Sequence, residues 1–96
     1  MNKGELIDQI AEKAGISKKQ SDAVLTATLE SIVEAVSHGD KVTLVGFGSF
    51  EPRQRQQRQG RNPQTGKELI IPATTVPAFS AGKLFKEKVA GTISQS

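Results

Sequence analysis

The chain has 96 residues, a net charge of +3, 35% hydrophobic residues and only four aromatic residues, all phenylalanine. This composition predicts one small globular domain with a modest core, for which a partner subunit would supply further buried surface. The absence of cysteine excludes disulfides and thiolate metal sites. The first ten residues do not form a signal peptide, and no apolar run approaches the roughly 20 residues that cross a bilayer, so we expect a soluble cytoplasmic protein without a membrane partner.

Two helices are predicted first, joined by a short turn. Asn2 and Glu5 can form a capping box for the first helix, and Gly15 ends it. Ser17 begins the second helix, which continues to about His38 with apolar residues at helical spacing. Helices joined so closely form a helical hairpin or a helix-turn-helix.

The pattern then changes to that of strands. The segment KVTLVGFGSF, residues 41–50, is rich in β-branched and aromatic residues and predicts a strand with a glycine-marked bend or bulge. A turn is predicted around Asn62, Pro63 and Gly66, after which the chain returns as the extended segment KELIIPATTV, residues 67–76.

A last short helix is predicted after the strands. Pro77 and Ser80 introduce it, and the chain from Gly91 onward is expected to fray. No internal repeat or long linker divides the sequence. We therefore predict a single α+β domain over residues 1–96, with a helical part at 1–38, a sheet and an arm at 41–79, and a C-terminal helix at 80–90.

An enzyme is not expected from these residues. The only histidine, His38, lies in the last turn of a predicted helix, where it suits the helix dipole. The segment GFGSFE fails the dinucleotide-binding fingerprint, because Glu51 stands where the third glycine belongs. We expect no cofactor, no metal and no small-molecule substrate.

The charge is unevenly distributed along the chain. Residues 1–51 contain five basic and eight acidic side chains, a net charge of −3, whereas residues 52–96 contain eight basic and two acidic ones, a net charge of +6. Phosphates would repel a recognition helix in the acidic half, so the predicted second helix is better suited to packing a dimer than to reading DNA. The basic half predicts an electropositive surface that binds polyanions.

The arm, residues 53–67, is the most cationic part of that half. It contains four arginines, one lysine and no acidic residue, and its flanking strands and central turn favour a β-ribbon over a flexible loop. From Arg53 to Arg61 such a ribbon extends roughly 30 Å, enough to reach around a duplex. Arginine suits phosphates and a narrow minor groove. At the turn, Pro63 would serve either as a turn residue or as a rigid apolar wedge between base pairs.

Three motifs carry a resemblance to a known family. At GRNPQTGK, VGFGSF and VPAFSAGK the sequence resembles the HU family of bacterial histone-like DNA-binding proteins, which is related to integration host factor. The resemblance covers roughly residues 1–90. It implies an intertwined homodimer in which a helical body supports a curved antiparallel sheet as a saddle, with two β-ribbon arms. It also implies a location on the bacterial nucleoid.

The resemblance implies roles for individual residues. Pro63 would intercalate, with Arg61 and Asn62 beside it in the minor groove. Two positions depart from the family pattern: Pro52 predicts weaker strand pairing at the base of the arm, and glutamines are unusually frequent along it. The other implied DNA contacts are Lys3, Arg53, Arg55, Arg58, Lys67, Lys83 and Lys86, and the implied dimer core is Phe47, Phe50 and Phe79.

These observations predict an architectural protein that binds duplex DNA without sequence specificity, bends and compacts it, and prefers distorted or flexible DNA. If about four or five phosphates are neutralised, the slope of log affinity against log salt should be near −4. Two alternatives remain open: a site-specific DNA-bending protein of the integration host factor kind, and a module whose arm folds on RNA or on an acidic protein partner.

Overall fold

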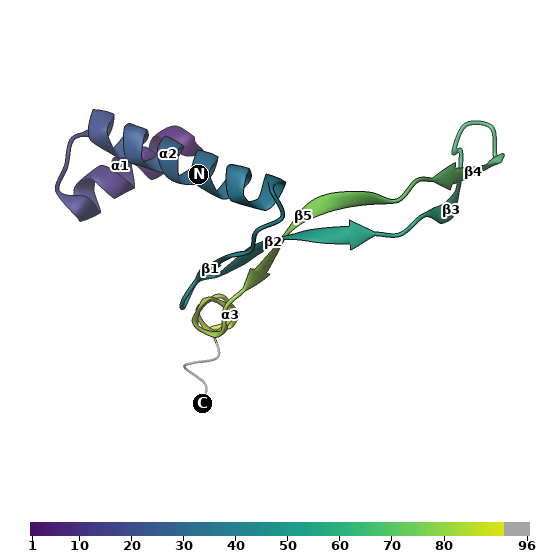
Figure 1. Ribbon diagram of the computed structural model, residues 1–96. Helices are drawn as coiled ribbons and strands as arrows, with labels where there is room; N and C mark the ends of the chain where they lie inside the picture. Colours follow the sequence, from purple (N-terminus) through teal and green to yellow (C-terminus); the bar gives the residue numbers. More distant parts are fainter. Residues whose placement is uncertain (92–96) are drawn as a thin grey trace. The chain divides into compact units, whose positions relative to one another are not determined.

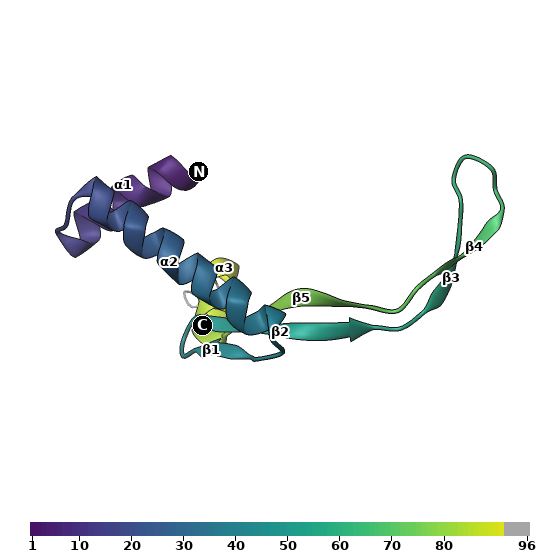
Figure 2. The same ribbon diagram turned by 45° about the horizontal axis from the view of Figure 1, so that its top comes forward.

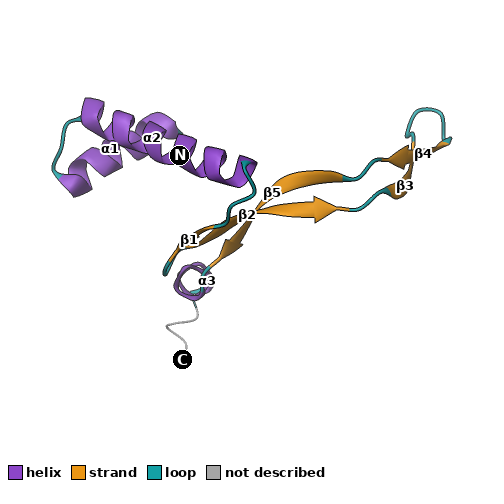
Figure 3. Ribbon diagram, viewed as in Figure 1, coloured by secondary structure: helices purple, strands orange, loops and turns teal. Residues whose placement is uncertain are grey.

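The computed structural model describes residues 1–91, so the expected fraying beyond Gly91 lies outside the described residues. The chain divides into two compact units, residues 1–34 and the residues from 35 onward. Figure 1 and Figure 3 show helices and antiparallel strands within one chain, which confirms the predicted α+β class. The elements in order are α1 (Lys3–Ala14), α2 (Lys18–Ser37), β1 (Val42–Leu44), β2 (Gly48–Arg55), β3 (Arg58–Arg61), β4 (Glu68–Ile71), β5 (Thr74–Ala81) and α3 (Lys83–Ala90).

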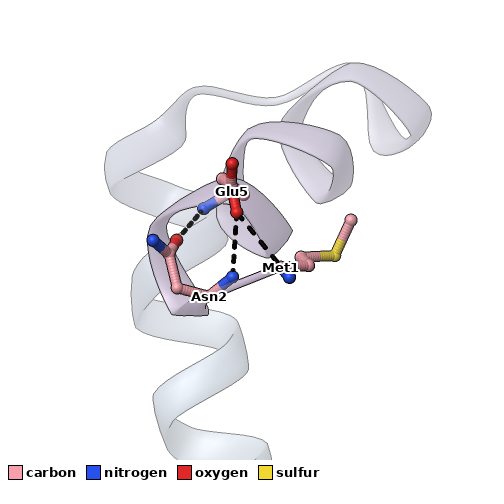
Figure 4. A network of polar contacts seen from close by, with 3 residues as sticks. All are labelled: Met1, Asn2 and Glu5. Atoms are coloured by element: carbon pink, nitrogen blue, oxygen red, sulfur yellow. Dashed lines mark hydrogen bonds and ion pairs between the residues drawn. The ribbon is translucent and has the colours of Figure 1, made fainter.

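The helix boundaries of the first unit follow from local hydrogen bonds. The Asn2 side chain accepts from the Glu5 backbone N–H at 2.9 Å, and the Asn2 backbone N–H donates to the Glu5 carboxylate at 3.0 Å (Figure 4). This reciprocal pair confirms the predicted capping box. Gly15 ends α1 in the left-handed conformation, with φ of 70°. The Ser17 side chain caps α2: its Oγ accepts from the Gln20 backbone N–H at 3.0 Å.

The second unit contains a three-stranded antiparallel sheet with the order β1-β2-β5. Its register places Phe50 opposite Val42 on one side and opposite Phe79 on the other. Gly48 lies where β2 begins, with φ of +156°, and a Cβ there would lie 2.5 Å from the Ser80 carbonyl oxygen. Only glycine therefore allows β2 and β5 to approach so closely at this point. The predicted single strand over residues 41–50 is wrong: β1 and β2 are separate strands that pair antiparallel and are joined by a turn at residues 45–47.

The prediction that Pro77 and Ser80 introduce the last helix is wrong. Pro77 does not introduce the last helix but lies within β5, directly opposite Pro52 of β2, and the pairing continues on both sides of them. Because neither proline has an N–H, they fit at a pair that exchanges no ladder hydrogen bonds, so Pro52 does not interrupt the ribbon. Ser80 also belongs to β5, and α3 begins at Lys83 with Gly82 as its N-cap.

The apolar side chains of the described chain stay open to solvent. No hydrophobic side chain among residues 1–91 is buried; the buried residues of this part of the chain are Ser21 and Gly48. On α2, Val24 and Val33 are 57% and 64% exposed. Folded proteins normally bury many such side chains, and large exposed apolar surfaces are typical of sites where a partner binds.

Candidate nucleic-acid interface

The cationic arm is a β-ribbon in two sections, as the sequence predicts in outline (Figure 2). In the base section, β2 and β5 pair from Gly48 opposite Ala81 to Arg55 opposite Thr74. Pairing then stops at residues 56–57 and 72–73. In the tip section, β3 and β4 pair from Arg58 opposite Ile71 to Arg61 opposite Glu68.

The tip section has an apolar contact that the sequence analysis missed. A Cβ on Gly60 would lie 2.8 Å from Cδ1 of Ile71 and 3.7 Å from Cδ1 of Leu69, so these two aliphatic side chains cover one face of the ribbon at this glycine. The signal was the segment ELII, which lies just beyond residues 53–67. The return strand therefore supplies the apolar face that the arginine-rich strand lacks.

Two of the predicted arginines lie beside the break between the sections. Arg55 ends β2 and Arg58 begins β3, and both are exposed. Together with apolar atoms of Ile71, Pro72 and Val76 they line a hollow of about 320 Å³. Guanidinium groups next to apolar surface suit a sugar–phosphate backbone, whose phosphate is charged and whose sugar presents carbon atoms.

The end of the arm is a closed turn. The Gly66 N–H donates to the Asn62 carbonyl at 2.7 Å, and the Asn62 N–H donates to the Lys67 carbonyl at 2.9 Å. Pro63 follows Asn62 in this turn and is exposed, whereas Asn62 is half-buried. The structure thus brings together the predicted neighbours Arg61, Asn62, Pro63 and Lys67 at one end of the ribbon.

Arg53, in the base section, already has an anionic partner. Its Nη2 lies 3.2 Å from Glu51 Oε2, and Lys41 Nζ lies 3.6 Å from Glu51 Oε1. The hydrogen bond from Arg53, followed by the charge of Lys41, holds the pKa of the Glu51 carboxyl below its ordinary value. A phosphate that binds Arg53 would have to compete with this carboxylate.

The lowered pKa of Glu51 predicts a pH effect on stability. A carboxyl whose pKa is lower in the folded state stabilises the fold above its unfolded pKa, and this contribution is lost as pH falls through the folded pKa. When the pH falls from about 6 to about 3, the melting temperature of Glu51→Gln should therefore fall slightly less than that of wild type. The difference is small because the Glu51 carboxylate is solvated. Circular dichroism melts measure it, with Glu87→Gln on α3 as the control. Parallel curves for wild type and Glu51→Gln would contradict the expectation.

The predicted lysines lie on the helices. Lys3 begins α1, where its Nζ lies 3.7 Å from Asp22 Oδ1 and donates to Thr26 Oγ1 at 3.2 Å. Lys83 and Lys86 lie on α3 and are exposed. Lys3 belongs to the first unit and the other two belong to the second. In the second unit, Lys83 and Lys86 add positive charge to that of the arm.

The three phenylalanines of the expected dimer core lie close together within one chain. The ring centroids of Phe50 and Phe79 are 4.8 Å apart, and those of Phe47 and Phe79 are 5.4 Å apart. Phe85 of α3 joins them, 5.2 Å from Phe47. Helical spacing predicts that Phe85 faces inward, but only the sheet geometry shows that it belongs with the other three. These four rings link the sheet to α3.

Within residues 1–91 no cluster of three or more histidine and acidic side chains could hold a metal ion. In the same part of the chain, no helix combines the length and apolar character needed to cross a membrane.

Comparison with known proteins places this α+β chain with its arginine-rich ribbon in a class. The sequence model described as bacterial DNA-binding protein matches residues 1–90. DNA-binding protein HU of Nostoc sp. is 73% identical over 90 residues, covering 94% of this chain and 96% of that protein. DNA-binding protein HU of Geobacillus stearothermophilus is 55% identical over 89 residues, covering 93% and 99%.

Solved structures agree with the sequence matches. A chain of the Anabaena HU–DNA cocrystal structure superposes with a TM-score of 0.91 at 73% identity, covering 94% of this chain and 98% of that one. HU from Thermotoga maritima superposes with a TM-score of 0.66 at 43% identity, covering 93% and 98%. The chain therefore belongs to the HU family of bacterial DNA-binding proteins, as the three sequence motifs indicate.

Proposed function

We propose that two copies of this chain form an intertwined homodimer that bends and compacts duplex DNA in the bacterial nucleoid without reading its sequence. The observation that carries the proposal is the arm: an arginine-rich ribbon that ends in a closed turn with Pro63 exposed. The Anabaena relative was crystallised with DNA, which supports the same class of ligand for this chain.

Affinity in this proposal comes mainly from phosphate contacts. Arg55 and Arg58 line a hollow beside the ribbon, and the described arm carries no acidic residue between Arg53 and Lys67. Phosphate contacts fix the position of a protein on a duplex but carry no sequence information. The glutamines along the arm supply no evident base-reading pattern, which supports binding without sequence specificity over site-specific binding.

Bending comes from the tip in this proposal. Pro63 is exposed, rigid and without an N–H, so it can enter between two base pairs without leaving a donor unsatisfied. Insertion unstacks the step, and the extra phosphate contacts of the bent duplex offset that cost. DNA that is already nicked or distorted should bind better, because less unstacking remains to be done.

The homodimer is supported by the open apolar surfaces. Phe47 and Phe79 lie in the aromatic cluster and are still 45% and 41% exposed. Leu84 and Val89 of α3, with Phe47 and Phe85, line an apolar hollow of about 430 Å³. A second copy of the chain would cover such surfaces, because a chain of this length buries too little by itself.

The test is the bending of a short duplex of arbitrary sequence, measured by fluorescence energy transfer between its ends at saturating protein. Wild type should bend it sharply, and Pro63→Ala should bind within about threefold of wild type but lose about half or more of the bend. Pro52→Ala, which removes a proline at the base of the same ribbon, should bend like wild type.

Other outcomes would point elsewhere. Equal bending by wild type and Pro63→Ala would reduce Pro63 to a turn residue. Binding confined to one sequence would favour a site-specific protein, and binding to single-stranded RNA without binding to duplex DNA would favour an interaction module.

A further inference from the structure

The turn at the end of the arm is held by its own hydrogen bonds. Besides the two backbone pairs that close it, the Lys67 N–H donates to Thr65 Oγ1 at 3.2 Å, and Arg61 Nη1 donates across the turn to the Gly66 carbonyl at 2.9 Å. Gly66 has φ of +74°, which the closed turn requires. The turn is therefore built before any ligand arrives.

The Asn62 side chain makes the bonds that enclose Pro63. Its Oδ1 accepts from the Gln64 N–H at 2.8 Å and lies 3.4 Å from the Thr65 N. The first bond spans Pro63, so it forms an Asx turn with the proline at its centre. Pro63 fixes its own φ and restricts Asn62 to extended backbone, and the side-chain bond fixes the direction of the chain that leaves the proline.

Resting on the proposed function, we propose that Asn62 is a positioning residue for the Pro63 wedge. The side-chain oxygen of Asn62, Oδ1, holds the turn in the shape that leaves the Pro63 ring exposed. This role does not require Asn62 to read base edges. The benefit is preorganisation: a loop that is already ordered loses less conformational entropy when the wedge is inserted.

The two roles of Asn62 require different atoms. In the minor groove, A·T pairs present only acceptors, so an asparagine that reads them must donate through its NH₂ group. Holding the turn requires only the oxygen, because the partners are backbone N–H groups. Aspartate keeps the oxygen and removes the donor, whereas alanine removes both, so the two variants separate positioning from base reading.

The experiment compares Asn62→Ala and Asn62→Asp with wild type, Pro63→Ala and Gln64→Ala on the same labelled duplex, each at saturating protein. Gln64→Ala is the matched control, because only its backbone takes part in the turn. Asn62→Asp should keep most of the wild-type bend despite weaker binding, since its extra charge repels phosphate. Asn62→Ala should lose about half or more of the bend, as Pro63→Ala does.

A second measurement tests the turn without DNA. The temperature coefficient of the Gln64 amide proton, measured by NMR, should indicate a hydrogen bond in wild type and in Asn62→Asp, and solvent exposure in Asn62→Ala. This measurement stays valid where a variant binds DNA too weakly to saturate.

The outcomes distinguish this inference from the function on which it rests. If wild type bends DNA and Pro63→Ala does not, but Asn62→Ala bends like wild type, the positioning role of Asn62 is overturned and the wedge stands. Loss of the bend in Asn62→Asp as severe as in Asn62→Ala, with the Gln64 amide still bonded, would assign Asn62 to base reading. Failure of wild type itself to bend DNA would overturn the proposed function.

Discussion

Phe79→Ala should destabilise the protein by about 3 kcal/mol or more, which lowers the melting temperature by roughly 10 °C or more for a domain of this size. Phe79 has three aromatic neighbours: its ring centroid is 4.8 Å from that of Phe50, 5.4 Å from Phe47 and 6.1 Å from Phe85. Within one chain it is still 41% exposed. In the proposed homodimer the partner covers this remaining surface, so the substitution removes contacts within the chain and between the chains.

The measurement is a set of circular dichroism melts at several protein concentrations. In a dimer that folds and associates together, the melting temperature of wild type rises with concentration, and Phe79→Ala should need a higher concentration to reach the same temperature. Ile70→Ala is the control, because Ile70 is 61% exposed and lies on the arm. A melting temperature independent of concentration, with Phe79→Ala close to wild type, would be inconsistent with an aromatic dimer core.

The double variant Arg55→Gln with Arg58→Gln removes four arginines from the proposed homodimer, two on each arm. It should weaken binding to duplex DNA by about 100-fold or more at moderate salt. It should also make the salt slope less steep by up to about 3.6, from a wild-type value near −4, if each arginine neutralises one phosphate. Both arginines are exposed beside the break in the ribbon and line the same hollow. Glutamine keeps a polar side chain but removes the charge, so the change isolates phosphate neutralisation. The loss should be similar for duplexes of different sequence, because phosphate contacts carry no base information.

Titrations of a labelled duplex at several salt concentrations give the slope directly. Gln54→Ala with Gln56→Ala is the matched control: it also changes two side chains beside the break but alters no charge, and its slope should equal that of wild type. A slope unchanged by loss of both arginines would mean that the phosphates are bound elsewhere, for example by Lys83 and Lys86 of α3.

The parts of the fold that could be predicted from the sequence are those that depend on neighbouring residues. The start of α1 was predictable because Asn2 and Glu5 form a capping box through local hydrogen bonds. Its end was predictable because Gly15 readily adopts the left-handed conformation that ends a helix. The helix after the strands was misplaced because a proline and a serine are common at helix starts. The pairing of Pro77 with Pro52 overrides that preference, and it depends on a strand register that no local pattern contains.

The same reason explains which parts of the site were missed. The arginines and Pro63 could be proposed as candidates from the sequence, because their chemistry is unusual for the middle of a chain. Two contacts were missed because they join residues that are distant in the sequence or lie on different elements. One is the contact of Leu69 and Ile71 with Gly60, and the other is the contact of Phe85 with the other rings. The role of the Asn62 oxygen depends on the geometry of the turn, which the sequence NPQTG indicates but does not specify.

The interruption of pairing at residues 56–57 and 72–73 has a mechanical consequence. Elsewhere along the ribbon, a change of direction must strain or break the bonds between two strands, whereas at this interruption there are no ladder bonds to break. We therefore expect the arm to bend most easily at this interruption, which lies directly between Arg55 and Arg58. In the proposed function, a tip that bends at this point would follow duplexes of different curvature while β2 and β5 keep their pairing.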